Sequence, residues 1–82
     1  MAAHLSEITS IVRAVLHADG IEVLPDTRFE DLAGWDSMDL ISVVVEVECC
    51  YGLTFEPVDI EGLATIGDLS DMIEAKRALA SA

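Results

Sequence analysis

Residues 36–52 read DSMDLISVVVEVECCYG, and the conformation of this stretch decides the fold class. Val43, Val45 and Val47 alternate with other side chains, a strand pattern in a residue type that favours strands. The stretch also has a helical interpretation, in which one set of side chains recurs with a period near 3.6. That set comprises Met38, Ile41, Val44, Val45, Glu48 and Tyr51.

The two ends of the stretch favour the helix. Residues 37–51 are fifteen in number, which is long for a strand. Asp36, Ser37 and Asp39 at the start are residue types found at helix N-termini, and Gly52 follows at the position where helices often stop. We therefore predict a helix over residues 37–51.

Residues 4–17 predict an earlier helix, because their apolar side chains follow helical spacing along one broad face. Gly20 lies just beyond this pattern, and a left-handed helix stop is predicted there. The apolar side chains of the face are Leu5, Ile8, Ile11, Val12, Val15 and Leu16.

A long connection is predicted between the two helices. Thr27 and Glu30 have the spacing of a capping box, so a short helical turn is expected to start there. Phe29 and Leu32 are its predicted anchors in the core. Gly34 permits a tight bend before the second helix.

The C-terminal part predicts two more helices. Residues 57–63 form a short one with Ile60 and Leu63 facing inward. A last helix starts at a Thr65–Asp68 capping box, runs to about residue 80, and turns Ile66, Leu69, Met72 and Ile73 inward. The fold class is thus all-α, a four-helix bundle with three main helices and a short third helix. One domain over residues 1–82 is expected from the length.

The charge of the chain is strongly acidic and unevenly placed. The net charge is −12 and the pI about 4.1. Residues 29–75 contain twelve Asp or Glu residues and no Lys or Arg. Nucleic acids and anionic membranes are therefore excluded as partners, because both bind through Lys and Arg. The segregated acid instead favours partner proteins with a basic patch.

The cysteines and histidines predict neither a disulfide framework nor a metal site. Cys49 and Cys50 are adjacent, and neighbouring cysteines in a helix point in different directions. His4 and His17 lie far apart in the sequence. No signal peptide and no apolar run of transmembrane length is evident. A protein of the reducing cytoplasm is expected.

Ser37 is the candidate for chemistry. At the start of a helix, free backbone N–H groups and the positive end of the helix dipole would favour a phosphate ester. The simpler interpretation is an N-cap serine, although Asp36 is equally suited to be the cap. A hydrolase nucleophile is disfavoured, because residues 34–38 do not read Gly-x-Ser-x-Gly and no histidine is placed to act as base.

Residues 31–39, Asp-Leu-Ala-Gly-Trp-Asp-Ser-Met-Asp, resemble the attachment motif of acyl and peptidyl carrier proteins, Asp-Leu-x-Gly-x-Asp-Ser-Leu. The resemblance extends in the right order over roughly residues 5–75. Within it, residues 25–29, 46–55 and 64–69 are similar to the segments that flank the motif in that family. Met38 replaces the commoner leucine, a change that nearly conserves volume.

The resemblance implies a four-helix carrier fold and a covalent cofactor. Ser37 would receive 4′-phosphopantetheine from a phosphopantetheinyl transferase that uses coenzyme A. The thiol of the arm would hold an acyl or aminoacyl group as a thioester, so the chain would have no turnover of its own. The implied partners are the transferase, an acyl- or aminoacyl-loading enzyme and a downstream synthase or transferase with a basic docking patch. A free-standing chain is expected, because the sequence starts with Met and has no linker. A monomer is also expected.

The docking face is predicted around Ser37. It comprises Asp36, Asp39 and Glu48, with apolar contact from Leu40, Val45 and Cys49. Trp35 is expected either to contact the arm or a partner, or to fold onto its own loop. The apolar outer side of this helix indicates polyketide, nonribosomal-peptide or related specialised biosynthesis. The alternatives are a housekeeping carrier of fatty-acid synthesis and an unmodified carrier-like interaction module.

Overall fold

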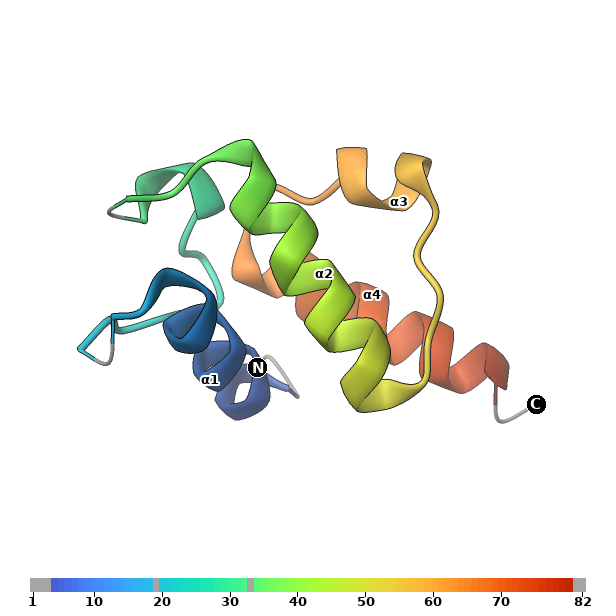
Figure 1. The fold of residues 1–82 in the computed structure, drawn as a ribbon. Helices are drawn as coiled ribbons and strands as arrows, with labels where there is room; N and C mark the ends of the chain where they lie inside the picture. The colour runs from blue at the N-terminus through green and yellow to red at the C-terminus, as the bar shows by residue number, and fades with distance from the viewer. Residues whose placement is uncertain (1–3, 19, 33, 81–82) are drawn as a thin grey trace.

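Four α-helices and one short 3-10 turn make up the part of the chain that the computed structural model describes, residues 4–18, 20–32 and 34–80 (Figure 1). No strand occurs within these ranges, so the predicted all-α bundle with a short third helix is confirmed. The elements are α1 (Leu5–Leu16), η1 (Phe29–Asp31), α2 (Ser37–Tyr51), α3 (Pro57–Glu61) and α4 (Ile66–Ala80).

The ambiguous stretch is a helix, and its ends explain why. Asp36 is the N-cap of α2, and its carboxylate accepts hydrogen bonds from the N–H groups of Met38 and Asp39. The Asp39 carboxylate accepts in turn from the N–H of Asp36, which completes a capping box. Gly52 ends the helix at φ 67°, a left-handed conformation that suits glycine.

The buried face of α2 covers only part of the set with helical spacing. Val43, Val44 and Val47 are buried, with exposed fractions of 0–2%. Met38 and Ile41, which belong to the set with helical spacing, are 68% and 42% exposed. Helix α2 carries apolar residues on two sides, and contact with the other helices decides which side is buried.

The core lies where α1, α2 and α4 meet (Figure 1). Both outer helices turn their predicted apolar faces inward, which confirms that part of the prediction. The core side chains that are fully inaccessible to solvent are Ile8, Val12, Val43, Val47, Ile66, Leu69 and Ile73. Burial of these aliphatic side chains is the main favourable contribution to stability in a domain of this size.

The end of α1 comes earlier than predicted. His17, not Gly20, takes the left-handed conformation, with φ 52°. The N–H of Ala18 reaches back to the carbonyl of Arg13, as in a Schellman-type helix end. Arg13 Nε also donates to the carbonyl of Ile21 at 2.7 Å, which holds the departing chain against the helix.

The connection between α1 and α2 contains the expected helical turn, but Thr27 does not cap it. Arg28 precedes η1 and makes no side-chain cap bond, while the Thr27 hydroxyl accepts from the N–H of Leu24. Phe29 and Leu32 are buried as predicted. Gly34 has φ 78°, which confirms the tight bend.

The start of α4 binds this connection to the bundle. The N–H groups of Ile66 and Gly67 donate to the carbonyls of Thr27 and Pro25 at 2.9 and 2.7 Å. These are helix-terminal donors that have no partner inside their own helix. The predicted Thr65–Asp68 capping box is present in both directions. The connection is therefore fixed where it leads into α2.

The third helix is short and loosely embedded. It ends at Glu61, and none of its residues is fully buried, although Ile60 packs partly against the core. Leu63, beyond the helix end, is buried. Lys76 of α4 pairs with Asp59 of α3 at 2.9 Å and ties the short helix down. The Glu56 N–H, and next Lys76, hold the pKa of the Asp59 carboxyl below its usual value.

Candidate functional site

Ser37 is the first residue of α2 and is exposed to solvent. Because Asp36 makes both side-chain hydrogen bonds of the cap, the Ser37 hydroxyl is not needed for capping. The interpretation of Ser37 as an N-cap serine is therefore wrong. Its hydroxyl projects from a rigid helix end and is accessible to another protein.

The N–H groups at this helix end are not all free, contrary to the expectation from the sequence. Those of Met38 and Asp39 are bonded to the Asp36 carboxylate at 2.8 and 3.2 Å. A phosphate on Ser37 would thus benefit from the helix dipole more than from direct hydrogen bonds to these groups. The carboxylates of Asp36 and Asp39 each accept a hydrogen bond from the backbone N–H of the other residue. They therefore stabilise the start of the helix as well as carrying negative charge.

The other residues of the predicted docking face divide into two groups. Val45 and Cys49 are exposed on α2. Leu40 is only partly exposed and packs against the core. The Glu48 carboxylate accepts from the N–H of Phe55 at 2.8 Å, so it faces the connector after α2 rather than open solvent.

Two exposed residues near Ser37 were missed by sequence reasoning. Met38 and Ile41 lie with Val45 along one side of α2, at positions spaced three and four residues apart. Their spacing was visible in the sequence, but it was used only as a sign of a helix. Together Met38, Ile41 and Val45 form an exposed apolar strip, called the α2 strip below.

Trp35 lies two residues before Ser37 and is folded onto its own loop. Its ring stacks on Phe29, with centroids 5.2 Å apart and planes inclined by 20°. The ring is half-buried, so one part of it stays accessible. It also borders a cavity of about 200 Å³ together with Leu40 and Leu63.

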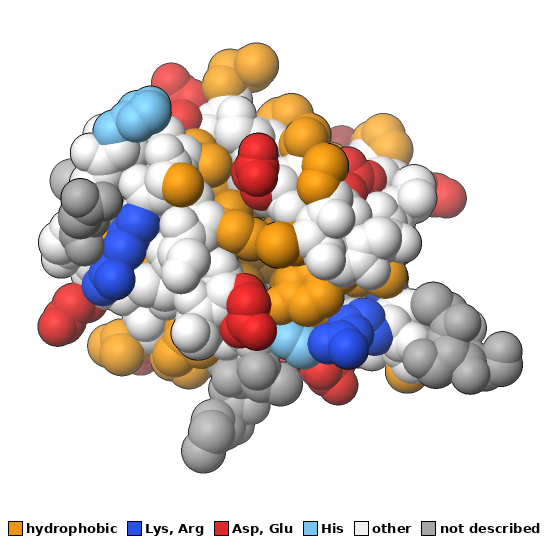
Figure 2. Space-filling view, turned by 60° about the horizontal axis from the view of Figure 1, so that its bottom comes forward, with side chains coloured by type: hydrophobic (Ala, Val, Ile, Leu, Met, Phe, Trp, Pro, Cys, Tyr) orange, Lys and Arg blue, Asp and Glu red, His pale blue; other side chains and the backbone are white. Residues whose placement is uncertain are grey.

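The chain carries sixteen Asp or Glu residues and only four Lys or Arg residues, so most of its acids have no basic residue to pair with. Figure 2 shows one face, on which acidic side chains stand singly around an apolar centre and basic side chains lie towards the edges. All four basic residues contact their own chain: Arg13 at the Ile21 carbonyl, Arg28 at Glu30, Lys76 at Asp59 and Arg77 over the Tyr51 ring. The remaining acids are thus available to an external basic surface.

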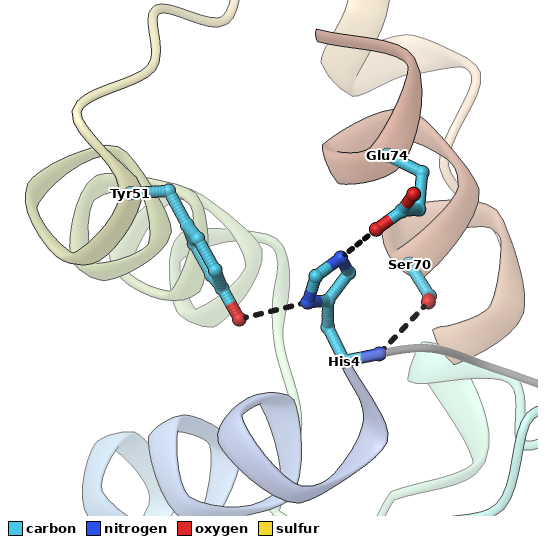
Figure 3. Close-up of polar contacts among 4 residues, drawn as sticks. All are labelled: His4, Tyr51, Ser70 and Glu74. Atoms are coloured by element: carbon cyan, nitrogen blue, oxygen red, sulfur yellow. Dashed lines mark hydrogen bonds and ion pairs between the residues drawn. The ribbon is translucent and has the colours of Figure 1, made fainter. Parts of the chain in front are cut away.

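A second polar cluster lies at the opposite end of α2 (Figure 3). His4 Nε2 donates to the Glu74 carboxylate at 2.5 Å, and its Nδ1 lies 3.3 Å from the Tyr51 hydroxyl. The backbone N–H of His4 donates to Ser70 Oγ. Burial, and next the charge of Glu7, raises the pKa of Tyr51. Tyr51 is fourteen residues from Ser37, about 21 Å along the helix, so this cluster joins helices and takes no part in the site.

Neither a metal site nor a membrane span is found in the described ranges. No group of three or more His, Cys, Asp or Glu side chains there is arranged to hold a metal ion. None of the helices within these ranges is long and apolar enough to cross a bilayer.

Comparison with known proteins gives consistent results. Residues 6–73 match the family model described as a phosphopantetheine attachment site. The chain is 32% identical over 71 residues to an acyl carrier protein of Thermotoga maritima, covering 87% of this chain and 88% of that protein. It is 34% identical over 73 residues to an acyl carrier protein of Prochlorococcus marinus, covering 89% and 91%.

A solved structure agrees with the fold. The solution NMR structure of the holo acyl carrier protein from Geobacter metallireducens superposes with a TM-score of 0.83 at 30% identity, covering 93% of this chain and 87% of that one. The prosthetic group of the chain is therefore phosphopantetheine, and the chain is a carrier rather than a catalyst. Its general partners are phosphopantetheinyl transferases and acyl-handling enzymes. The chain belongs to the acyl carrier protein family.

Proposed function

We propose that Ser37 is the attachment point of the 4′-phosphopantetheine arm. The observation that carries this proposal is an exposed serine hydroxyl at the start of α2 that its own cap does not use. An exposed hydroxyl on a rigid helix end suits a phosphodiester, because the acceptor oxygen is accessible and the dipole favours the added negative charge. When bound, the arm supplies the thiol that holds the acyl group.

The attachment step is a phosphoryl transfer catalysed by another enzyme. The Ser37 oxygen forms a bond to the pantetheine-side phosphorus of coenzyme A, and the phosphoanhydride bond of coenzyme A breaks. Adenosine 3′,5′-bisphosphate leaves, and the serine proton passes to a base of the transferase. This chain contributes the accessible oxygen and the acidic surface that the transferase recognises.

The test is the intact mass after incubation with coenzyme A and a broad-specificity transferase. We expect the mass of one arm to be added to the wild-type chain and none to Ser37→Ala. The matched control is Ser42→Ala, an exposed serine of the same helix, which should be modified like the wild type. Addition to Ser37→Ala, or no addition to the wild type, would reject the site. The second outcome would favour an unmodified interaction module.

We further propose that partners dock on α2 beside this serine. Asp36 and Asp39 provide acid at the helix start, and the α2 strip provides apolar contact, with Cys49 exposed one turn beyond Val45. The occupant is a protein surface with an apolar centre and a basic rim, as in a loading enzyme or a downstream synthase. Trp35 and Leu40 border this face, while the bonded Glu48 contributes little to it.

The docking face is tested with the transferase itself. Ile41→Glu places a charge in the middle of the α2 strip and should lower kcat/KM for arm transfer by about tenfold, mostly through KM. Leu79→Glu, at a side chain of α4 that is 77% exposed, is the matched control and should leave kcat/KM unchanged. Equal rates for the two variants would contradict docking on the strip.

The pathway that we favour is specialised biosynthesis of the polyketide or nonribosomal-peptide kind. The exposed α2 strip supports this assignment. Docking through acidic residues alone would not require an exposed apolar strip on the contact surface. The housekeeping alternative, fatty-acid synthesis, is favoured by the names of the relatives, which read acyl carrier protein without qualification. Two exposed free cysteines support a reducing compartment such as the cytoplasm. Loading by a fatty-acid malonyltransferase, measured by intact mass, separates the two pathways: efficient loading would favour the housekeeping role.

A further inference from the structure

Met38 is the most exposed residue of the α2 strip, and it follows Ser37 directly in the chain. It is 68% exposed, against 42% for Ile41 and 46% for Val45. Met72 of α4, by contrast, is partly buried and packs against the core. Of these two methionines, Met38 is therefore the one that small solutes reach freely.

The thioether of an accessible methionine is open to a reversible two-electron oxidation. Hydrogen peroxide converts it to a sulfoxide: one peroxide oxygen is bonded to the sulfur, and the other leaves as water. The flexible apolar side chain thereby becomes polar and chiral. A methionine sulfoxide reductase restores the thioether, because two of its thiols form a disulfide and the sulfoxide oxygen leaves as water. A leucine at this position could not undergo this chemistry.

The position of Met38 places it under any protein that brings a catalytic group to the Ser37 oxygen. The Cα atoms of adjacent residues lie about 3.8 Å apart, and both residues are exposed at the same helix end. Met38 also begins the α2 strip, in which Ile41 follows three residues later on the same side of the helix. A transferase that acts on Ser37 therefore contacts the Met38 side chain.

Oxidation of Met38 changes this contact but not the fold. A sulfoxide oxygen that is covered by an apolar partner surface loses its hydrogen bonds to water, and binding weaker by about tenfold is the expected size of the effect. The helix start is unaffected, because the cap uses the backbone N–H of Met38 and not its side chain. The core is unaffected too, since Met38 is neither buried nor packed against it.

We propose that Met38 is a reversible oxidation site, and that its sulfoxide slows arm transfer to Ser37 by weakening the docking of the transferase. This proposal rests on attachment of the arm at Ser37 and on docking along α2. Hydrogen peroxide is uncharged, so the acidic surface of the chain does not repel it. The chain thus accepts its arm readily under reducing conditions and slowly after exposure to peroxide.

The experiment uses the full chain without its arm, so that the thiol of the arm cannot be oxidised. Cys49 and Cys50 are exposed thiols that peroxide also attacks, and Cys49→Ser and Cys50→Ser together give a cysteine-free background. The chain is treated with hydrogen peroxide until Met38 but not Met72 is oxidised, as located by peptide mass, and catalase then removes the peroxide. Arm transfer from coenzyme A is measured, and each kcat/KM is divided by the value for the same variant without peroxide.

We expect Met38 to gain one oxygen atom sooner than Met72, and kcat/KM for arm transfer to fall by about tenfold, mostly through KM. Reductases for both sulfoxide epimers should restore the rate. In the same background, Met38→Leu should keep its own rate after peroxide. Met72→Leu, the matched control, should lose rate as the background does. The Tm of the oxidised chain, followed by circular dichroism, should equal that of the untreated chain.

The outcomes separate the two proposals. No arm on the untreated chain would overturn the attachment site and this proposal with it. Normal transfer to the untreated chain, with an unchanged rate once Met38 is oxidised, would overturn this proposal alone. A loss of rate in Met38→Leu, or a loss that the reductases do not reverse, would assign the effect to another group. A Tm lowered by oxidation would contradict it as well, because the sulfoxide would then act through the fold.

Discussion

Replacement of Asp36 by Asn or by Ala separates the capping role of this residue from its proposed docking role beside Ser37. Its carboxylate accepts hydrogen bonds from the N–H groups of Met38 and Asp39 at 2.8 and 3.2 Å. The Asp39 carboxylate accepts a hydrogen bond from the Asp36 N–H at 2.9 Å. Asn keeps a side-chain oxygen in the same place and ranks with Asp as an N-cap, whereas Ala removes the acceptor. The acidic charge is lost in both variants.

The magnitudes follow from the cap. Asp36→Ala should lower the free energy of unfolding by about 1–2 kcal/mol, the range for loss of a cap oxygen. For a chain of 82 residues, each kcal/mol corresponds to a fall in Tm of about 4–8 °C. Asp36→Asn should lose only the interaction of the charge with the helix dipole, about 0.3–1 kcal/mol at an exposed site.

Two measurements check this prediction. In thermal unfolding followed by circular dichroism, the Tm should fall from the wild type to the Asn variant and again to the Ala variant. The larger fall is expected between the Asn and the Ala variants. Arm transfer at low salt should be slower by about two- to fivefold in both variants, because both lack the charge that meets a basic partner. Equal Tm values for the Asn and Ala variants would refute the capping role, and wild-type transfer rates for Asn would refute the docking role.

Three further predictions concern stability. Gly67→Ala should destabilise by about 1–3 kcal/mol in urea unfolding, because its Cβ would lie 2.8 Å from the Pro25 carbonyl oxygen, while Gly62→Ala, with 3.6 Å of space, should not destabilise. His17→Gly should raise Tm by about 2–8 °C, because glycine relieves the left-handed φ of 52° at the end of α1; an unchanged or lower Tm would contradict the strain. The Ala64 N–H, and next that of Thr65, hold the pKa of Asp68 below its usual value of 3.8. The contribution of Asp68 to the free energy of unfolding is therefore complete above pH 3.8, and it is lost as the pH falls through the lowered pKa. Asp68→Asn should therefore flatten the decline of stability below about pH 4 in acid titration, and an unchanged slope would argue against it.

The helices could be predicted from the sequence wherever their ends are set by nearby residues. Asp36 and Gly52 bracket α2 through contacts within four residues, and the Thr65–Asp68 pair starts α4 in the same way. These capping contacts outweigh the strand preference of the valines, because the cap side chain accepts hydrogen bonds from backbone N–H groups at the helix start. A strand at the same residues would need partners from another segment for these N–H groups.

The buried face of α2 could not be predicted, for a physical reason. The α2 strip and the buried valines both have helical spacing, so periodicity alone leaves two solutions. The choice is made by α1 and α4, which lie far away in the sequence and cover only one side. The predicted stop of α1 at Gly20 was wrong for a similar reason, since the contact between Arg13 and Ile21 joins residues eight positions apart.

The cavity was even harder to predict from the sequence. It needs the Phe29 and Trp35 rings to stack across the bend at Gly34, and Leu63 to arrive from beyond α3. Each of these residues looks ordinary in the sequence, and only their convergence creates the space. The candidate attachment serine was predictable because a short motif carries it, whereas the cavity depends on packing between segments.

The two apolar sides of α2 explain how one helix can serve both the core and the proposed docking face. Val43, Val44 and Val47 anchor it in the core, so the α2 strip cannot turn inward without exposing them. The strip is therefore held open to solvent, and it runs from the residue after Ser37 to Val45, about 12 Å along the axis from Ser37. Because a helix is rigid over this length, a partner that binds the strip receives the arm at a fixed distance and from a fixed direction. Such geometry raises the effective concentration of the tethered thioester at the partner's active site without any contact to the cargo.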